Sequence, residues 1–248
     1  MKRAIFLTAY DRPEYLREAL ESWKNVRGQE NWHFVAMIEP SPVGSEVVQM
    51  FEEFLKQSGF PTYQILVNPQ RYGVLHHPWV GFERLFMASN FDFVVRAEDD
   101  LRVSTDTLEY FEWASEQWQD NPSVATVNAF TYATHGTAND VQLCPVFSPL
   151  VWGTWRDRWA DWMSRTWDHD YSTNNGTPME QAGWDWNLNT RLFPQMGLHA
   201  AFPLASRVDN IGLVGTHSTP ENYSTSDSFQ LDHGAVSYRL VSDATLGR

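Results

Sequence analysis

The chain has 248 residues, of which 42% are hydrophobic and 20% are charged, so it can bury a sizeable core. Acidic residues outnumber basic ones 31 to 18. This balance argues against nonspecific nucleic-acid binding, which needs Lys and Arg to neutralise phosphates. No apolar run approaches the roughly 20 residues that span a bilayer, and we see no signal-peptide pattern. The single cysteine, Cys144, has no second cysteine to pair with, which fits a reducing compartment, and we expect a cytoplasmic location.

The first half of the chain alternates between strand-like and helix-like patterns. Short apolar runs rich in β-branched and aromatic residues predict strands, and apolar residues at spacings of three and four predict helices between them. This alternation favours an α/β fold with a mostly parallel sheet and right-handed crossovers. We find no repeat or linker and expect one domain, 1–248. The predicted strands cover residues 4–10, 33–39, 62–67, 91–96 and 124–129, and the predicted helices begin at Pro13, at Ser45, near His77 and after Ser104 or Thr105.

Three consecutive carboxylates, Glu98, Asp99 and Asp100, follow the predicted strand 91–96. Ligands of open α/β sheets bind beyond the carboxyl ends of the strands. Adjacent carboxylates repel one another and burial raises their pKa values. A divalent cation removes this conflict, because hard cations prefer carboxylate oxygens. The alternative is a solvated acidic turn that complements the dipole of the following helix.

The turn after the first predicted strand has the sequence Thr8-Ala-Tyr-Asp-Arg-Pro13. A dinucleotide-binding fold would have a Gly-x-Gly-x-x-Gly turn at this place, so the sequence disfavours NAD and FAD. Arg12 carries forked donors that suit a diphosphate. A surface ion pair is the alternative role for this side chain.

The second half is rich in tryptophan, with seven of the chain's 12 within residues 152–186. Spacings of three and four favour one face of a helix packed into the core. The tryptophans with this spacing are Trp152, Trp155, Trp159 and Trp162.

Trp184 and Trp186 flank Asp185, and amphipathic aromatics beside a carboxylate suit a polar ligand with apolar faces, such as a sugar. Partial burial there would raise the basicity of Asp185, and a local cap or an ion pair with Arg191 is the alternative. Residues 168–178, rich in Ser, Thr, Asn and Gly, predict a loop before this segment.

Residues 208–218 have the pattern of a strand end followed by a glycine-bearing turn that presents His217. A lone histidine is usually a surface or structural residue. Neutral imidazole can also complete a cation site built from carboxylates, which leaves both roles open for His217.

Together these segments resemble a nucleotide-sugar glycosyltransferase of the GT-A fold, most specifically the N-acetylglucosaminyltransferase I family. Residues 4–12 are similar to that family's first strand, which ends in an aspartate-arginine pair. Residues 98–111 resemble its Glu-Asp-Asp metal motif with the following helix, Trp184-Asp-Trp186 resembles its tryptophan-aspartate motif, and residues 212–217 resemble its late loop. The resemblance runs in the same order over most of residues 4–220. It implies a mixed, mostly parallel Rossmann-like sheet flanked by helices, with a nucleotide-sugar-binding half, 1–130, and an acceptor-binding half, 131–248.

The resemblance also implies a role for each matching residue. Asp100 would bind Mn²⁺ or Mg²⁺ directly, and His217 would be an auxiliary metal ligand. Asp185 would be the general base, with Asp168, Asp170 and Glu180 as substitutes. The residues implied to contact the donor are Arg12 at its nucleotide or diphosphate, Glu39 and His77 at a uracil base, and Glu98 and Asp99 near its ribose and sugar.

Two departures from the family pattern concern the donor and the acceptor. Glu39 stands where the family has an aspartate, and Gly183-Trp-Asp185 stands where it has Trp-Asp-Asp. The implied activity is metal-dependent, inverting transfer of a hexosyl or N-acetylhexosaminyl group from a nucleotide-diphosphate sugar, with UDP as the expected nucleotide. The acceptor is left open among a glycan, a protein, a small molecule and a modified nucleobase. A noncatalytic carbohydrate-binding protein and a sugar nucleotidyltransferase are the alternatives, although a basic, glycine-rich loop for a triphosphate is missing from the N-terminal turn.

Overall fold

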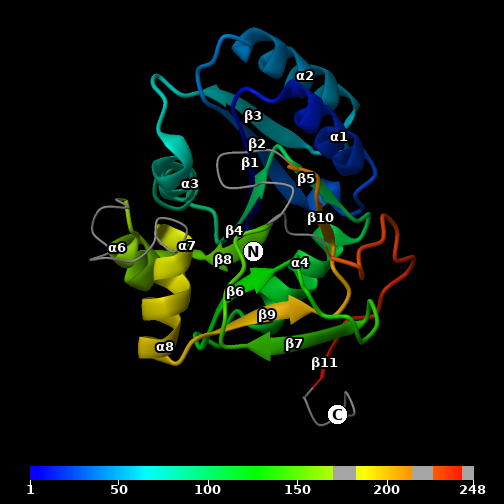
Figure 1. The fold of residues 1–248 in the computed structure, drawn as a ribbon, viewed down its shortest axis with the longest axis vertical. Coiled ribbons are helices and arrows are strands. Elements are labelled where there is room, and N and C mark those ends of the chain that lie inside the picture. Colours follow the sequence, from blue (N-terminus) through cyan, green and yellow to red (C-terminus); the bar gives the residue numbers. More distant parts are fainter. Residues whose placement is uncertain (170–182, 214–225, 242–248) are drawn as a thin grey trace.

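The computed structural model describes residues 1–169, 183–213 and 226–241. These residues form a nine-stranded sheet with the order β11-β7-β9-β6-β8-β4-β1-β2-β3, and a small sheet in which β5 pairs with β10 (Figure 1). The strands are β1 (Arg3–Ala9), β2 (Trp32–Ile38), β3 (Thr62–Val67), β4 (Phe93–Glu98), β5 (Leu101–Val103), β6 (Val124–Asn128), β7 (Asp140–Cys144), β8 (Trp152–Trp155), β9 (His199–Pro203), β10 (Val208–Asn210) and β11 (Arg239–Leu240).

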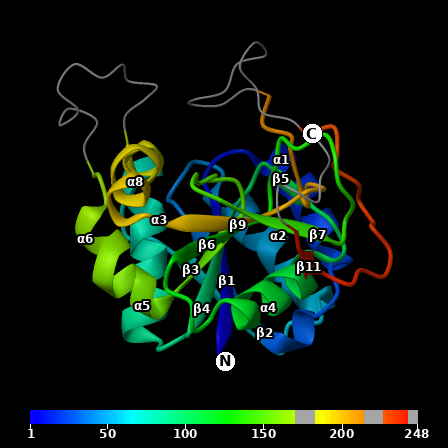
Figure 2. The same cartoon turned by 90° about the horizontal axis from the view of Figure 1, so that it is seen from below.

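Helices lie on both sides of the large sheet (Figure 2), with α1, α2 and α4 on one side and α3, α5, α6 and α8 on the other. The longer helices are α1 (Pro13–Lys24), α2 (Gly44–Gln57), α3 (Gly73–Glu83) and α4 (Thr107–Gln117). The short ones are α5 (Arg156–Arg158), α6 (Ser164–Thr166), α7 (Trp184–Asn187) and α8 (Phe193–Met196), and π-helical turns cover Arg84–Ala88, Trp159–Met163 and Leu188–Leu192. None of the helices within the described ranges is long and apolar enough to cross a membrane.

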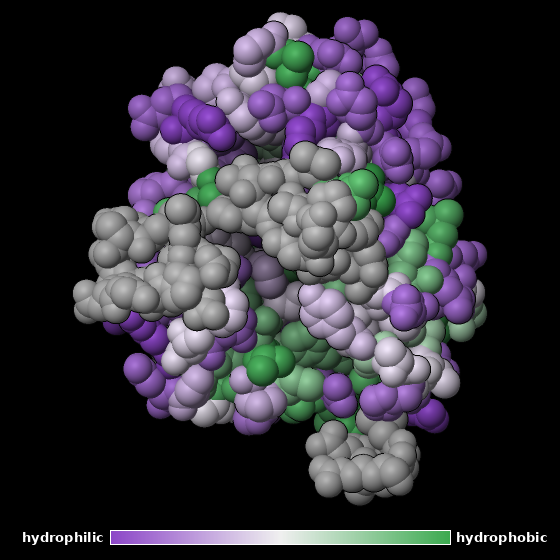
Figure 3. Space-filling model, in the orientation of Figure 1, coloured by the Kyte–Doolittle hydropathy of each residue, from purple (hydrophilic) through white to green (hydrophobic). Residues whose placement is uncertain are grey.

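The two layers of helices follow from the alternation of side chains along β1. Ile5 and Leu7 point into a core shared with α1, α2 and α4. Phe6, between them, points into a second core shared with α3 and the tryptophan-rich segment. A strand in the middle of a parallel sheet is buried on both faces, which is why its sequence is continuously apolar. The outward sides of α1 and α2 are polar (Figure 3), as expected for helices that bury one face.

The α/β architecture predicted from the sequence is confirmed. Strand β1 pairs in parallel with β2 and with β4, and β2 pairs in parallel with β3. Two predicted helix caps are wrong. The helix α2 begins one residue before Ser45, with Val43 as N-cap, and Asp106 is the N-cap of α4. The hydroxyl groups of Ser104 and Thr105 are used elsewhere, because they bond to Gln230 and Asp232 of the C-terminal segment.

The prediction of one tryptophan-bearing helix is correct about burial and wrong about secondary structure. Trp152 and Trp155 belong to β8, whereas Trp159 and Trp162 lie in the π-helical turn. All four residues of β8 are buried. A strand that is buried on both faces can place tryptophans at any spacing, so a spacing of three did not identify a helix.

Candidate functional site

The predicted donor residues gather at one edge of the large sheet. Because β1, β2 and β4 are parallel, their carboxyl ends lie at the same edge. The segments after these ends carry Arg12, Glu39 and the Glu98–Asp100 turn. The topology therefore brings together residues that are far apart in the sequence, at the edge where α/β sheets bind ligands.

An arginine connects the first strand to the acidic turn. The Arg12 guanidinium forms ion pairs with Asp99, at 2.6 Å, and with Asp100, at 2.8 Å. The backbone N–H of Tyr10 also donates to Asp99, over 3.3 Å. The third carboxylate, Glu98, is paired with Arg96, whose side chain is buried in β4. Arg12 is thus neither an isolated surface charge nor an ordinary surface ion pair, because it is the counter-charge of the acidic turn.

Burial makes this turn electrostatically unfavourable in spite of Arg12. Burial is the main cause that raises the pKa of Asp99 to about 7, with smaller contributions from Asp100 and Glu98, while Arg12 opposes the change. Burial and the nearby Glu98 also raise the pKa of Asp100 above its usual range. One buried and one largely buried carboxylate share one arginine, so this turn can accept additional positive charge.

The β5–β10 pair holds Asp100 against a glycine. The backbone N–H of Ile211 donates to the carbonyl of Asp100 over 2.9 Å, directly after β10. A Cβ atom on the next residue, Gly212, would lie 2.9 Å from the Asp100 Cγ, closer than real carbon atoms approach each other. Glycine at position 212 therefore lets the chain pass beside the Asp100 carboxylate. The predicted auxiliary ligand His217 lies outside the described residues.

The donor atoms at this turn fit a hard divalent cation. Carboxylate oxygens are its preferred ligands, and the raised pKa values of Asp99 and Asp100 show that the turn lacks positive charge. Within residues 1–169, 183–213 and 226–241, no three His, Cys, Asp or Glu side chains are arranged so that they could hold a metal ion. Residues of this turn would therefore bind the cation together with ligands from outside this set, such as diphosphate oxygens.

A second polar group surrounds the start of α3, where Glu39 is bonded to the helix terminus. The backbone N–H groups of Tyr72 and Gly73 donate to the Glu39 carboxylate over 2.6 and 2.9 Å. Arg71 lies 3.7 Å from Glu39, and its guanidinium covers the Tyr10 ring at 4.2 Å. Since Tyr10 also bonds to Asp99, this group is continuous with the acidic turn.

His77 lies beside Glu39, as expected for a shared site, with 3.7 Å between its Nδ1 and the Glu39 Oε1. Burial, followed by the positive charge of Arg96, lowers the pKa of His77 to about 3. The imidazole is therefore neutral at physiological pH. Its buried Nε2 has no hydrogen-bond partner. A neutral imidazole with one unused nitrogen can give or accept a hydrogen bond to a neutral heterocycle.

Asp185 lies in the first turn of α7 and is half-buried. Of its two neighbours, Trp186 is 38% exposed, whereas Trp184 is buried and stacks on Trp167 with the ring centroids 4.5 Å apart. The predicted sugar-facing role of Trp184 is therefore corrected, because its ring is a core element and only Trp186 is exposed. The predicted loop 168–178 lies outside the described residues from position 170 onward.

Two arginines that contact the candidate site were missed by sequence reasoning. Arg96 sits inside the otherwise apolar β4, two residues before Glu98, and this unexpected charge could have identified it. Arg71 follows β3 in a loop, and nothing in its sequence context indicates its contacts with Tyr10 and Glu39.

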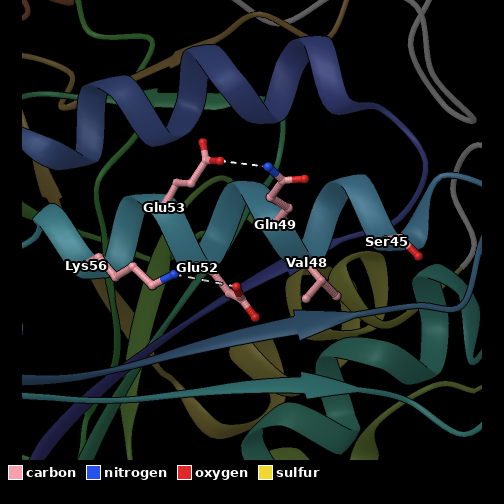
Figure 4. A pocket seen from close by; sticks show the side chains of 6 residues that line it. All are labelled: Ser45, Val48, Gln49, Glu52, Glu53 and Lys56. Atoms are coloured by element: carbon pink, nitrogen blue, oxygen red, sulfur yellow. Dashed lines mark hydrogen bonds and ion pairs between the residues drawn. The ribbon is translucent and has the colours of Figure 1, made fainter.

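A separate hollow lies along α2 (Figure 4) and does not resemble a catalytic site. Its polar side chains contact one another along the helix, where the Gln49 amide donates to Glu53 and Lys56 lies 3.7 Å from Glu52. The lining residues all belong to α2, and they are Ser45, Val48, Gln49, Glu52, Glu53 and Lys56.

Comparison with known structures identifies the fold. A mannosyltransferase, PcManGT from Pyrobaculum calidifontis in complex with GDP-Man and Mn²⁺, matches 82% of this chain with a TM-score of 0.54 and 14% identity. S. aureus TarS 1–349 matches 86% of this chain and 61% of its own, with a TM-score of 0.58 and 12% identity. GalNAc-T7 with UDP, GalNAc and Mn²⁺ matches 88% of this chain and 45% of its own, with a TM-score of 0.59 and 10% identity.

The likeness is structural, and it covers only part of each neighbour. This chain spans 54% of the length of the mannosyltransferase. No protein-family model matches the sequence, and no curated protein sequence matches it either. The mixed, mostly parallel nine-stranded sheet flanked by helices is shared with these neighbours, and the chain has the GT-A glycosyltransferase fold.

Proposed function

We propose that this protein is a metal-dependent glycosyltransferase that moves a hexosyl or N-acetylhexosaminyl group from a UDP-sugar to an acceptor hydroxyl, with inversion at the anomeric carbon. The observation that carries the proposal is the acidic turn. Asp99, which is buried, and Asp100, which is 14% exposed, lie at the carboxyl edge of a GT-A sheet and share the single counter-charge of Arg12. A donor diphosphate with its cation would supply the missing positive charge and use Arg12 as a second anchor.

The donor contacts are proposed for residues 1–130 and the acceptor contacts for residues 131–248. Asp100 is proposed as the direct metal ligand, with His217 as its auxiliary, and Glu98 and Asp99 are proposed to lie nearer the donor ribose and sugar. The group formed by Glu39 and His77 is proposed to hold the base. Two structural neighbours were solved with Mn²⁺, one with GDP-Man and one with UDP and GalNAc, which supports a donor bound together with a divalent cation.

The base site is proposed on the contacts at the start of α3. Glu39 already accepts bonds from two backbone N–H groups, so it fixes the loop before α3 as well as facing the site. His77 keeps a free, neutral Nε2 for a base edge. The planar pair of Arg71 over Tyr10 offers a surface on which a heterocycle can stack.

The proposed transfer step assigns one task to each of these groups. A cation held by Asp100 would supply Lewis-acid stabilisation of the leaving diphosphate. Asp185 takes the proton of the acceptor hydroxyl, whose oxygen bonds to the anomeric carbon as the bond to the diphosphate oxygen breaks. The bonding electrons leave with the diphosphate, and the Arg12 guanidinium also stabilises its negative charge. Base catalysis of this kind contributes about 10²–10⁴-fold. The exposed ring of Trp186 beside Asp185 offers an apolar face to the acceptor.

The direct test is a screen of nucleotide sugars for Mn²⁺-dependent hydrolysis, in which water replaces the acceptor. We expect release of UDP from one UDP-sugar, suppressed by EDTA and restored by Mn²⁺. Product analysis separates this outcome from a nucleotidyltransferase, which would release pyrophosphate from UTP and a sugar phosphate. Binding of sugars without any nucleotide binding would contradict the proposal and favour a carbohydrate-binding protein. A clear preference for GDP or dTDP in competition binding would contradict the choice of UDP.

A further inference from the structure

Pro78 lies inside the helix α3 and removes one of its hydrogen bonds. In an α-helix the carbonyl of residue i accepts the N–H of residue i+4, so the carbonyl of Val74 would accept the N–H of residue 78. Proline has no N–H, so the Val74 carbonyl lacks its i+4 main-chain donor. Proline in a helix interior is therefore unfavourable, and another donor to the freed carbonyl offsets part of this cost.

The compensating donor is the indole of Trp184. Its Nε1–H donates to the Val74 carbonyl over 3.3 Å. The neighbouring carbonyl of Leu75 accepts the Nε1–H of Trp167 over 2.8 Å. The two indoles are almost parallel, with 6° between their planes, so they act as one stacked unit against α3.

The same indole contacts β4. The guanidinium of Arg96 lies over the Trp184 ring, 5.2 Å from its centroid, and Arg96 is ion-paired with Glu98 of the acidic turn. Trp184 is therefore bonded to the helix that carries His77 and packed under the arginine that holds Glu98. The next residue in the chain is Asp185.

We infer that Trp184 is a positioning residue, whose indole N–H replaces the helical hydrogen bond that Pro78 removes and thereby fixes α7, with Asp185, against α3 and β4. This inference rests on the proposed function for the role of Asp185. A displacement of about 1 Å at a reacting group can cost about 10²-fold in rate. α7 is the first turn of a continuous helical segment that runs through the π-helical turn to Met196, so contacts of Trp184 act directly on the turn that carries Asp185.

The test is a pair of substitutions measured in two backgrounds. Trp184→Phe keeps an aromatic ring and removes the N–H, and Pro78→Ala gives the Val74 carbonyl a main-chain donor. Trp184→Phe also removes packing in both backgrounds, so the difference between them reports the hydrogen bond. We expect Trp184→Phe to lower the folding equilibrium constant about fivefold more in the natural background than with Pro78→Ala, the scale of one hydrogen bond. Urea unfolding measures both values without any ligand.

Trp167→Phe is the matched control. It removes an indole N–H from the same stack, but the Leu75 carbonyl also faces the main-chain N–H of Trp79. Pro78→Ala should therefore leave the cost of Trp167→Phe unchanged. An equal cost of Trp184→Phe in both backgrounds would overturn the inferred hydrogen-bond replacement.

The positioning role is read from kinetics. We expect Trp184→Phe to lower the kcat of transfer about tenfold with the donor KM within twofold, and Pro78→Ala to restore most of the lost kcat. An unchanged kcat in an active enzyme would overturn the positioning role. If the chain shows no transfer while the unfolding comparison shows the expected coupling, the proposed function fails and the hydrogen-bond replacement stands.

Discussion

Two buried groups of carboxylate and arginine side chains in this protein differ in their charge balance. Arg207 and Asp106 are both fully buried and 3.0 Å apart, one cation for one anion. Arg207 also donates to the carbonyls of Ala205 and Ala138. At the acidic turn, the single guanidinium of Arg12 serves both Asp99 and Asp100.

The difference separates a structural pair from a binding site. The Arg207 guanidinium is enclosed by the rings of Tyr110 and Tyr238, with no surplus charge for a ligand to meet. Arg12 is 30% exposed, and the carboxylates beside it have raised pKa values. Surplus negative charge at the open edge of the sheet is a cost to stability that a cation can relieve.

Removing the cation of the balanced pair should have the largest effect on stability. Arg207→Leu leaves Asp106 buried and unpaired, and we expect a loss of about 3–5 kcal/mol in the free energy of unfolding. Urea denaturation measures it. The control is Arg239→Leu, which breaks the ion pair between Arg239 and Asp140. The Arg239 side chain is 65% exposed, so this change should lower the free energy of unfolding by less than about 1 kcal/mol. Equal losses for both variants would contradict a structural role specific to Arg207.

The proposed base should affect rate and leave donor binding intact. Asp185→Asn keeps the shape and removes the proton acceptor, so transfer should fall by about 10²-fold or more at saturating donor. Binding of the UDP-sugar with Mn²⁺, measured by calorimetry, should stay within about twofold, because Asp185 is not among the donor contacts. Retention of most of the rate would place the base on another carboxylate, with Asp168, Asp170 and Glu180 the next to test.

Acid should destabilise the protein through His77. Its pKa of about 3 in the folded state lies below the ordinary value of 6.5, so the unfolded state binds the proton first as the pH falls. Stability is therefore complete above pH 6.5 and is lost below it, at about 1.4 kcal/mol per pH unit, or about 2 kcal/mol by pH 5. His77→Asn should flatten this part of the profile of unfolding free energy against pH. The control is His135→Asn, which changes an exposed histidine and should leave this part of the profile unchanged. An unchanged slope in His77→Asn would contradict the burial argument.

A smaller effect is expected where the chain passes the acidic turn. Gly212→Ala places a methyl group against the Asp100 carboxylate and should push it aside. We expect the Mn²⁺-dependent affinity for UDP to fall about tenfold, because the displaced Asp100 carboxylate would bind the cation in a poorer geometry. Gly44→Ala is the control, since its nearest neighbour is the Ser41 hydroxyl at an ordinary 3.8 Å. Full affinity in Gly212→Ala would show that Asp100 does not need this close approach.

The predictable parts of the molecule are those decided by local pattern. The strands β1, β2, β3, β4 and β6 were located from their apolar runs, whereas the short strand β5 was missed. The acidic turn was placed correctly at the end of β4, because carboxylates directly follow its last buried residues. Arg12 is 87 residues from Asp99, so their ion pair depends on the parallel pairing of β1 with β4 and could not be seen in the sequence. Pattern also failed for Trp152, because a doubly buried strand imposes no spacing. The role of Trp184 could not be predicted either, because its indole N–H donates to the Val74 carbonyl, 110 residues away in the chain.

The most direct test of the acidic turn is calorimetric titration of UDP, with and without Mn²⁺, into the natural protein and into Asp100→Asn. We expect Mn²⁺-dependent binding by the natural protein and at least about a 100-fold loss in the variant, because a direct cation ligand is removed. The free energy of unfolding of the metal-free variant should be equal or higher, since the change replaces one of two adjacent, repelling carboxylates with a neutral amide. Asp209→Asn, which changes a nearby carboxylate paired with Arg102, is the matched control and should bind as the natural protein does. Undiminished Mn²⁺-dependent UDP affinity in Asp100→Asn would contradict the account.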